Sequence, residues 1–145
     1  MSRQEKSLYM TVLMTPDMAN FSGKVHGGAL LKLLDQVAYA CAARYCGNYV
    51  VTVSLDQVTF NQPINVGELV SFRAHVNYVG RCSMEIGVKG ISENLHTKKK
   101  RHTNSCYFTM VAVDDTGKPI PAPPLELKTE FERKLHEAAL MRKKM

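Results

Sequence analysis

Asn20-Phe-Ser-Gly-Lys-Val-His-Gly-Gly-Ala-Leu-Leu-Lys-Leu-Leu-Asp35 is the stretch that decides the fold, because it joins a glycine-rich loop to the start of a strongly apolar helix. From residue 29 to residue 46, apolar side chains fall on nearly every side of that helix. A helix that is hydrophobic all round is buried inside a protein rather than laid on its surface. We therefore predict a central, enclosed helix over about residues 27–46, ended by Gly47.

Asp35 places a carboxylate in the second to third turn of this apolar helix. An unpaired buried charge is costly, so the group must be neutralised, partnered or exposed to a polar pocket. A functional interpretation is a base at the centre of a site. The alternative is a core carboxylate held by hydrogen bonds, or one exposed at an interface.

His26-Gly27-Gly28 sets two glycines where the first backbone amides of the helix are unpaired. Glycine lets a ligand approach the backbone closely, and the helix dipole favours negative charge there. An oxyanion forming on a thioester carbonyl would fit such donors. The alternative is that the glycines only make the turn, and that His26 only packs at the helix start rather than acting as a base or an oxyanion donor.

The distance between these groups predicts a second copy of the chain. Asp35 lies eight residues after Gly27, about 12 Å along a helix that rises 1.5 Å per residue. A single carbonyl would not reach both groups on one helix. If the two act together, a two-fold dimer with the site at its interface is expected.

The rest of the chain has the texture of an antiparallel sheet. Runs rich in β-branched and aromatic residues, with short turns between successive ones, predict neighbouring strands at 8–14, 49–60, 68–79, 82–91 and 103–113, with a polar loop over 92–101. A proline-rich connector then leads to apolar residues at helical spacing. The expected fold class is α+β: a long buried helix wrapped by a curved antiparallel sheet in one domain over 1–125, followed by an amphipathic C-terminal helix over 126–145.

Composition excludes several classes of protein. The 145 residues suit one domain, and no apolar run reaches the 18 or so residues of a membrane span. The N-terminus leads into no signal-like apolar core, so we expect a cytoplasmic protein. Four cysteines without a CxxC pair argue against zinc. The net charge of +6 has neither interleaved aromatics nor a helix-turn-helix pattern to support nucleic-acid binding.

Four blocks carry a family resemblance: Pro16-Asp-Met-Ala-Asn20, Val25-His-Gly-Gly28, Lys32-Leu-Leu-Asp35 and Ala43-Arg-Tyr-Cys46. In order and spacing they resemble the hotdog-fold acyl-CoA thioester hydrolases, the group of the bacterial YciA-type enzymes and the brain-type cytosolic acyl-CoA hydrolase. Weaker strand matches extend the resemblance over about residues 8–125.

The resemblance implies an enzyme that hydrolyses fatty acyl-CoA to free fatty acid and coenzyme A, without a metal or redox cofactor. Asp35 falls on the catalytic carboxylate of the family, as general base or nucleophile. Asn20 falls on a second position important for activity, and Gly27 and Gly28 on the helix terminus that binds the thioester oxygen. The relatives suggest homodimers, commonly assembled into trimers of dimers, with no nucleic-acid or membrane partner.

The resemblance also suggests where coenzyme A binds, against basic and small residues at subunit edges. Thr59 is expected to supply a supporting hydrogen bond. The expected substrate-binding residues are His26, Thr59, Gly80, Arg81, Ser83, Lys100 and His102.

Two other functions stay open on the sequence. One is a hotdog dehydratase or hydratase acting on an acyl thioester, for which only His26 is available as the histidine. The other is a non-catalytic sensor that binds acyl-CoA without turnover. The sequence leaves acyl chain length undetermined.

Overall fold

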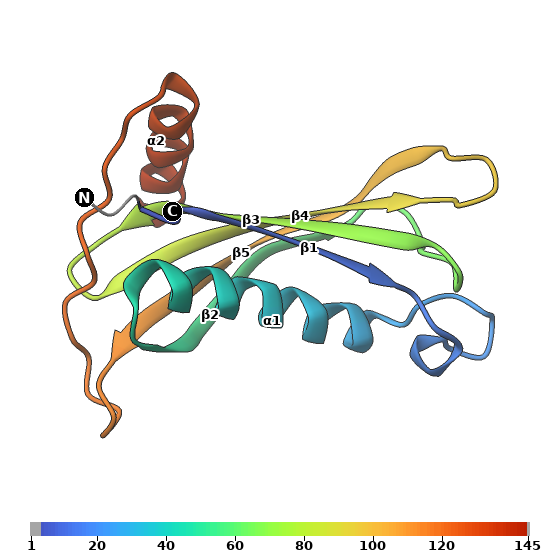
Figure 1. Ribbon diagram of the computed structural model, residues 1–145, viewed down its shortest axis with the longest axis horizontal. Helices are drawn as coiled ribbons and strands as arrows, with labels where there is room; N and C mark the ends of the chain where they lie inside the picture. Colours follow the sequence, from blue (N-terminus) through green and yellow to red (C-terminus); the bar gives the residue numbers. More distant parts are fainter. Residues whose placement is uncertain (1–3, 145) are drawn as a thin grey trace.

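The computed structural model describes residues 4–144 and contains one sheet and two main helices. The elements are β1 (Ser7–Leu13), a short 3-10 turn (Pro16–Met18), α1 (Gly27–Cys46), β2 (Tyr49–Phe60), β3 (Leu69–Val79), β4 (Ser83–Glu93), β5 (Lys100–Val113) and α2 (Glu130–Lys144). Figure 1 shows α1 along one face of the sheet, here the inner face, and α2 on the opposite, outer face. The expected hotdog fold, a long helix against a curved antiparallel sheet, is confirmed.

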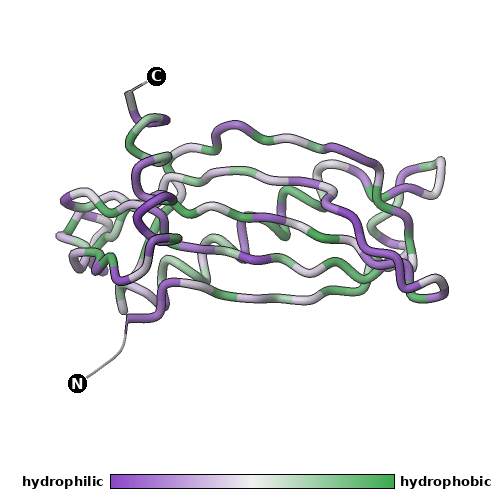
Figure 2. The backbone as a smooth tube through the Cα atoms, turned by 90° about the horizontal axis from the view of Figure 1, so that it is seen from above, coloured by the Kyte–Doolittle hydropathy of each residue, from purple (hydrophilic) through white to green (hydrophobic). Residues whose placement is uncertain are grey.

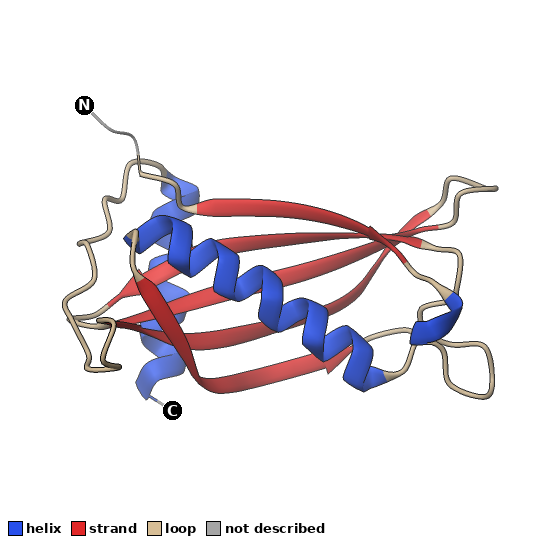
Figure 3. Cartoon of the chain, turned by 60° about the horizontal axis from the view of Figure 1, so that its bottom comes forward, coloured by secondary structure: helices blue, strands red, loops and turns tan. Residues whose placement is uncertain are grey.

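The core lies between α1 and the inner face of the sheet. In β3 and β4 alternate residues are buried, as a half-covered sheet requires. Phe72, Ile86 and Phe108 are fully or almost fully buried and pack with Leu34 and Val37 of α1. Each such side chain contributes about 1.5–3 kcal/mol by leaving water, so this layer fixes α1 across the sheet (Figure 3).

One face of α1 is not enclosed. The side chains of Lys32, Asp35, Gln36, Tyr39 and Arg44 are exposed in the single chain. The expectation of a helix buried on every side is therefore wrong for one copy. The sheet covers only the stripe that faces it, and the opposite stripe carries the polar residues that interrupt the apolar run.

The sheet order differs from the simple succession of hairpins that the short turns suggested. The strands lie in the order β1-β3-β4-β5-β2, all antiparallel, so β2 pairs with β5 and not with β3. The segment 61–68 crosses between the two sides of the sheet at the end where α1 begins, where Val25 N–H donates to the Ile64 carbonyl. β2 thereby becomes an edge strand.

Strand β5 begins earlier than the sequence indicated. Lys100 pairs with Glu93, so the basic run enters the strand and the β4–β5 loop is short. Arg101, half-buried, lies 2.8 Å from the buried carboxylate of Glu68 and donates to Gln62. This pairing holds the basic run in the sheet, whereas its charge alone predicted a loop.

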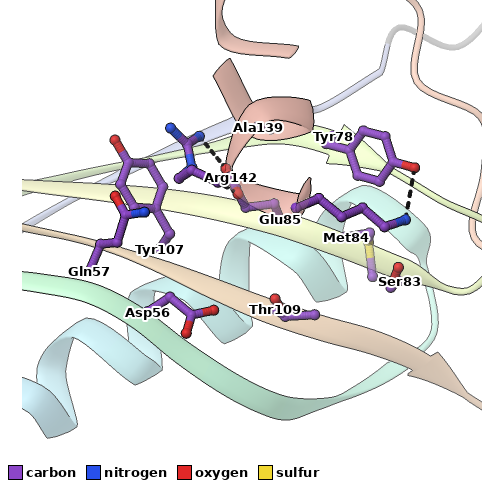
Figure 4. Close-up of a pocket in the computed structure, with 11 residues that line it drawn as sticks. Asp56, Gln57, Tyr78, Ser83, Met84, Glu85, Tyr107, Thr109, Ala139 and Arg142 are labelled. Carbon is purple, nitrogen blue, oxygen red and sulfur yellow. Dashed lines mark hydrogen bonds and ion pairs between the residues drawn. The ribbon is translucent and has the colours of Figure 1, made fainter. Parts of the chain in front are cut away.

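Helix α2 begins at Glu130, four residues later than predicted, because Thr129 caps it. The Thr129 hydroxyl accepts from Glu132 N–H, and the Glu132 carboxylate accepts from Thr129 N–H, the reciprocal arrangement of a capping box. Lys6 binds the same carboxylate at 2.8 Å. The other end is held by Arg142, whose Nε donates to Glu85 at 3.0 Å (Figure 4).

Seen from above, α2 crosses one end of the strands and leaves the rest of the outer face without a helix (Figure 2). Within residues 4–144, no helix is long and apolar enough to cross a membrane.

Candidate active site

Asp35 lies in the middle of α1, on its exposed stripe, beside the inner face of β2. The Thr52 hydroxyl donates a hydrogen bond to Asp35 Oδ1 at 2.8 Å. No other side chain among the described residues binds this carboxylate, so Oδ2 stays open to a ligand or to water. Thr52 therefore fixes the orientation of a carboxylate whose second oxygen is available for chemistry.

The first turn of α1 offers two free backbone donors. The His26 side chain caps the helix, with Nδ1 accepting from Ala29 N–H at 3.1 Å. The amides of Gly27 and Gly28 have no hydrogen-bond partner among the described residues, and space is open around Gly27. Because Nδ1 accepts, the proton of a neutral His26 is on Nε2. The arrangement can bind a carbonyl oxygen that gains negative charge.

Asn20 shapes the loop before the helix. Its Oδ1 accepts from Ser22 N–H at 2.9 Å, from the Ser22 hydroxyl at 2.7 Å and from Lys24 N–H at 3.2 Å. Its backbone N–H donates to the Lys24 carbonyl at 2.7 Å. With Oδ1 committed to the loop, the exposed amide NH2 group is the part of Asn20 that can reach a ligand.

A single chain does not bring these groups together. Gly27 and Asp35 lie on the unbroken helix α1, about 12 Å apart along its axis. Three surface pockets formed by residues 4–144 do not include Asp35 among their lining residues. One copy thus holds two half-sites: a carboxylate in mid-helix, and a donor group at the helix start with Asn20 beside it.

The other expected site residues fall at both ends of the molecule. Lys100 and His102 begin β5, at the end where α1 starts. Gly80, Arg81 and Ser83 form the β3–β4 turn at the opposite end, closed by a bond from Gly80 N–H to the Ser83 carbonyl at 2.8 Å. Within one chain these two groups do not meet.

Thr52 is a residue that the sequence analysis missed, having named Thr59 instead. The Thr59 hydroxyl lies 3.0 Å from Ser105 Oγ and makes no bond to Asp35. The usable signal was the alternation of strand residues, which puts Thr52 on the same face of β2 as the buried Val50. Finding the partner of Asp35 also needed the position of β2 in the sheet, which the sequence did not provide.

Two buried cysteines are poorly suited to nucleophilic attack. Burial raises the pKa of Cys41 to about 12, against a smaller opposing effect of Arg44, and burial alone raises the pKa of Cys106 to about 12. Such thiols are poor nucleophiles at neutral pH. Among residues 4–144, no three His, Cys, Asp or Glu side chains are grouped to hold a metal ion.

The free edge of β2 is apolar and exposed. The side chains of Tyr49, Val51 and Val53 are exposed on this edge strand, and Tyr39 is exposed on α1, four residues after Asp35. An unpaired edge with apolar side chains is a template for another strand. It lies beside the exposed stripe of α1, so a copy bound there would approach Asp35.

The model of the thioesterase superfamily matches residues 22–99. Protein VdlD of Helicobacter pylori is 54% identical over 138 residues, which span 95% of this chain and 79% of that protein. A solved hexameric acyl-CoA thioesterase, without ligand, superposes with a TM-score of 0.92 at 37% identity, covering 97% of this chain and 90% of the other.

An acyl-CoA hydrolase from Staphylococcus aureus, solved with butyryl coenzyme A, coenzyme A and coenzyme A disulfide, has a TM-score of 0.89 at 31% identity, covering 97% of this chain and 85% of the other. It has also been solved with alanine in place of an asparagine, an aspartate or a threonine. Those three positions are 15 and 17 residues apart in its sequence. Asn20, Asp35 and Thr52 have the same separations here.

Proposed function

The chain belongs to the thioesterase superfamily, and we propose on that basis that it hydrolyses fatty acyl-CoA thioesters to a free fatty acid and coenzyme A. The observation that carries the proposal is the Asp35 carboxylate, held by Thr52 and exposed in mid-helix. The shared spacing of Asn20, Asp35 and Thr52 with the altered positions of the S. aureus hydrolase supports it.

In the proposed reaction, Asp35 acts as general base. It takes a proton from water as the water oxygen attacks the thioester carbonyl. The Gly27 and Gly28 amides of a second copy bind the oxyanion. The tetrahedral intermediate then collapses and the carbon–sulfur bond breaks. The coenzyme A thiolate leaves and takes up the proton that Asp35 removed from water. The Asn20 amide, also from the second copy, orients the water or the carbonyl.

Asp35 could instead attack the carbonyl itself and form an acyl anhydride that water opens. A single turnover in H2(18)O reveals the anhydride route when water opens the anhydride at the Asp35 carbonyl. If Asp35 is the base, the label enters the fatty acid only. If Asp35 is the nucleophile and water opens the anhydride at its own carbonyl, the label enters the Asp35 carboxylate, as mass spectrometry of the peptide would show.

The assembly we propose is a homodimer formed along β2, and further a trimer of dimers. The apolar edge of β2 and the two separated half-sites support the dimer; the relative solved as a hexamer supports the larger assembly. We propose that coenzyme A binds between Lys100 and His102 of one copy and the Gly80–Ser83 turn of another. Arg81 of that turn would contact the phosphates of coenzyme A. We also include His26 and Thr59 among the residues proposed to contact the substrate.

The first experiment measures thiol release from short, medium and long acyl-CoAs, with wild type beside Asp35→Asn. We expect hydrolysis by the wild type and a loss of at least about a hundredfold in kcat for the folded variant. Gln36→Glu, on the neighbouring exposed position, is a control for altered charge on this stripe. If the wild type binds acyl-CoA but hydrolyses none of these substrates, the protein is a non-catalytic acyl-CoA sensor and not an enzyme.

A second experiment tests whether each site uses two chains. Asp35→Asn and Asn20→Ala are prepared separately, then dissociated together and reassociated. A mixed dimer regains one intact site only if Asp35 works with Asn20 of the other chain, so random pairing restores about a quarter of the wild-type sites. If both residues act within one chain, the mixture stays as inactive as its components.

No observation favours the dehydratase or hydratase function, because His26 already uses Nδ1 to cap α1. The cytoplasmic location expected from the sequence stays a prediction.

A further inference from the structure

The outer face of the sheet contains a pocket of about 400 Å3, on the side away from Asp35. It lies between α2 and strands β3, β4 and β5. Phe131 and Leu135 of α2 form one wall, and Arg73 and Lys89 border it on the sheet. Its volume falls within the range of small-molecule sites.

The floor of this outer-face pocket includes one strand position without a side chain, Gly87 of β4. His75, Gly87 and Tyr107 lie opposite one another on β3, β4 and β5. A Cβ at Gly87 would lie 2.7 Å from Asn77 Nδ2 and 3.4 Å from the Tyr107 ring. The Asn77 amide and the Tyr107 ring therefore occupy the space above Gly87, and a side chain at this position would have to displace them.

The next row brings two positive charges together. Arg73 and Lys89 are directly opposite in the register of β3 and β4. Like charges in that position are destabilising, by roughly 0.2–1 kcal/mol. Within residues 4–144 neither of them forms an ion pair, and the residues that line the pocket include no carboxylate. An anion bound between them would relieve the repulsion.

A buried polar atom in the same pocket lacks a partner. His75 Nδ1 is shielded from solvent and has no hydrogen bond among the described residues. Buried polar atoms are rarely left unpaired, because an unmet hydrogen bond costs about 1–3 kcal/mol. Because this atom is shielded from solvent while the pocket is open, a ligand would reach it only after the His75 ring moves, so the argument for a ligand rests on the cation pair and the apolar wall.

The opposite wall is apolar and open. Phe131 is 55% exposed where it borders the pocket. Its ring lies edge-on to the His75 ring, with 6.1 Å between the two ring centroids. A ligand that satisfied the whole pocket would have an anionic head toward Arg73 and Lys89 and an apolar body along Phe131 and Leu135.

We propose that the outer-face pocket binds a small amphiphilic carboxylate. Its head lies between Arg73 and Lys89, where the guanidinium fork matches the two carboxylate oxygens. The free fatty acid is a molecule of this class; that identification rests on the proposed function, whereas the pocket does not. The protein thus has a second site, on the outer face of the sheet, for the acid that its active site releases; His102, proposed above to contact coenzyme A, also lines this pocket.

The test measures octanoate binding by isothermal titration calorimetry, with and without S-octyl-coenzyme A, a thioether that cannot be hydrolysed. We expect saturable binding of one octanoate per chain that persists with the thioether present. Arg73→Gln with Lys89→Gln should weaken it at least tenfold. Arg133→Gln, on an exposed part of α2 outside the pocket, is the matched control and should leave it unchanged.

Octanol, which has the tail without the charge, should bind at least tenfold more weakly than octanoate. Phe131→Ser should weaken octanoate binding while leaving the cation pair in place, and circular dichroism checks that each variant is folded. The proposal is overturned if no saturable binding occurs, if octanol binds as well as octanoate, or if the thioether displaces octanoate and the double variant does not weaken it. Because the assay needs no turnover, its outcome is separate from that of the hydrolysis experiment.

Discussion

At the scale of single residues, the contact between Thr52 and Asp35 is the most informative one. Thr52 donates a hydrogen bond from its hydroxyl to one carboxylate oxygen, and the same hydroxyl oxygen lies 3.2 Å from Met110 Sδ. A carboxylate on an exposed helix face has several rotamers. A hydrogen bond from a neighbouring strand selects one of them, so Thr52 acts on the reaction by positioning Asp35.

Thr52→Val removes this hydrogen bond and keeps the shape of the side chain. We expect kcat to fall about tenfold to a hundredfold, as a misplaced catalytic group does, with KM for acyl-CoA little changed. Thr11→Val, which breaks a hydroxyl contact to Ser71 on the outer face, is the matched control. Steady-state kinetics on both variants decide the matter: a rise in KM at constant kcat would contradict a positioning role.

At the scale of elements, the sequence predicted what local chemistry decides and missed what packing decides. The bounds of α1 and β2 follow from the glycines and from β-branched composition, and both predictions are confirmed. The predicted start of α2 is wrong, because it follows from the spacing of apolar residues alone. Thr129 and Glu132 carry the capping signature that marks the true start. The start of β5 was wrong because the buried pairing of Arg101 with Glu68 is a tertiary contact that charge patterning does not reveal.

The candidate site divides along the same line. Asp35 and the two glycines stand out in the sequence because a charge and flexible backbone interrupt an apolar pattern. The roles of Asp35, Gly27 and Gly28 in the reaction stay predictions. Thr52 does not stand out, since a threonine in a strand is ordinary and only the place of β2 beside α1 gives it a partner.

The docking of α2 gives a prediction about stability. Arg142 binds the carboxylate of Glu85 and lies 3.7 Å from the centroid of the Tyr107 ring, and both side chains of the ion pair are largely buried. Arg142→Ala leaves Glu85 without its partner, so we expect a loss of about 1–3 kcal/mol in the free energy of unfolding. Arg133→Ala, on the exposed side of α2, should cost less than about 0.5 kcal/mol. Urea denaturation of the two variants would contradict this if their midpoints coincided.

His75 gives a second prediction for the contact between β3 and α2. Burial lowers the pKa of His75, outweighing the opposing charge of Glu132, while the charge of Lys6 adds to the lowering. The folded state then binds fewer protons than the unfolded state below the ordinary histidine pKa of about 6.5. Stability contributed by neutral His75 is therefore full above that pH and is lost as the pH falls toward the folded pKa.

The measurement is urea denaturation at pH 7.5 and pH 5.5, for wild type and His75→Gln. The wild type should lose more stability between the two conditions than the variant, which cannot titrate at this position. The other four histidines are present in both proteins, so the difference between the two pH slopes reports His75 alone. Equal slopes would show that this ring is not held neutral by its surroundings.

At the scale of the whole molecule, the edge of β2 decides how copies assemble. Val53 is 61% exposed on that edge strand, at the irregularity between Thr52 and Ser54 in the β2–β5 pairing. Val53→Lys puts a charge where a second strand would pair, a device that blocks edge association. We expect a monomer by light scattering and a loss of hydrolysis, with Asp35 unaltered and the circular dichroism spectrum retained. Leu95→Lys, an exposed apolar position in the β4–β5 loop, is the control and should keep the assembly. A monomeric variant with full activity would refute a site made by two chains.

The exposed stripe of α1 has a consequence for how concentration acts on this protein. If the groups that complete the Asp35 site come from another copy, dilution alone switches the activity off without any chemical change to the chain. Substrate that bridges two copies opposes that dissociation by mass action, so it protects the assembly it needs. Specific activity then rises with protein concentration and with acyl-CoA, and the amount of chain in the cell sets both how many sites exist and whether each one works.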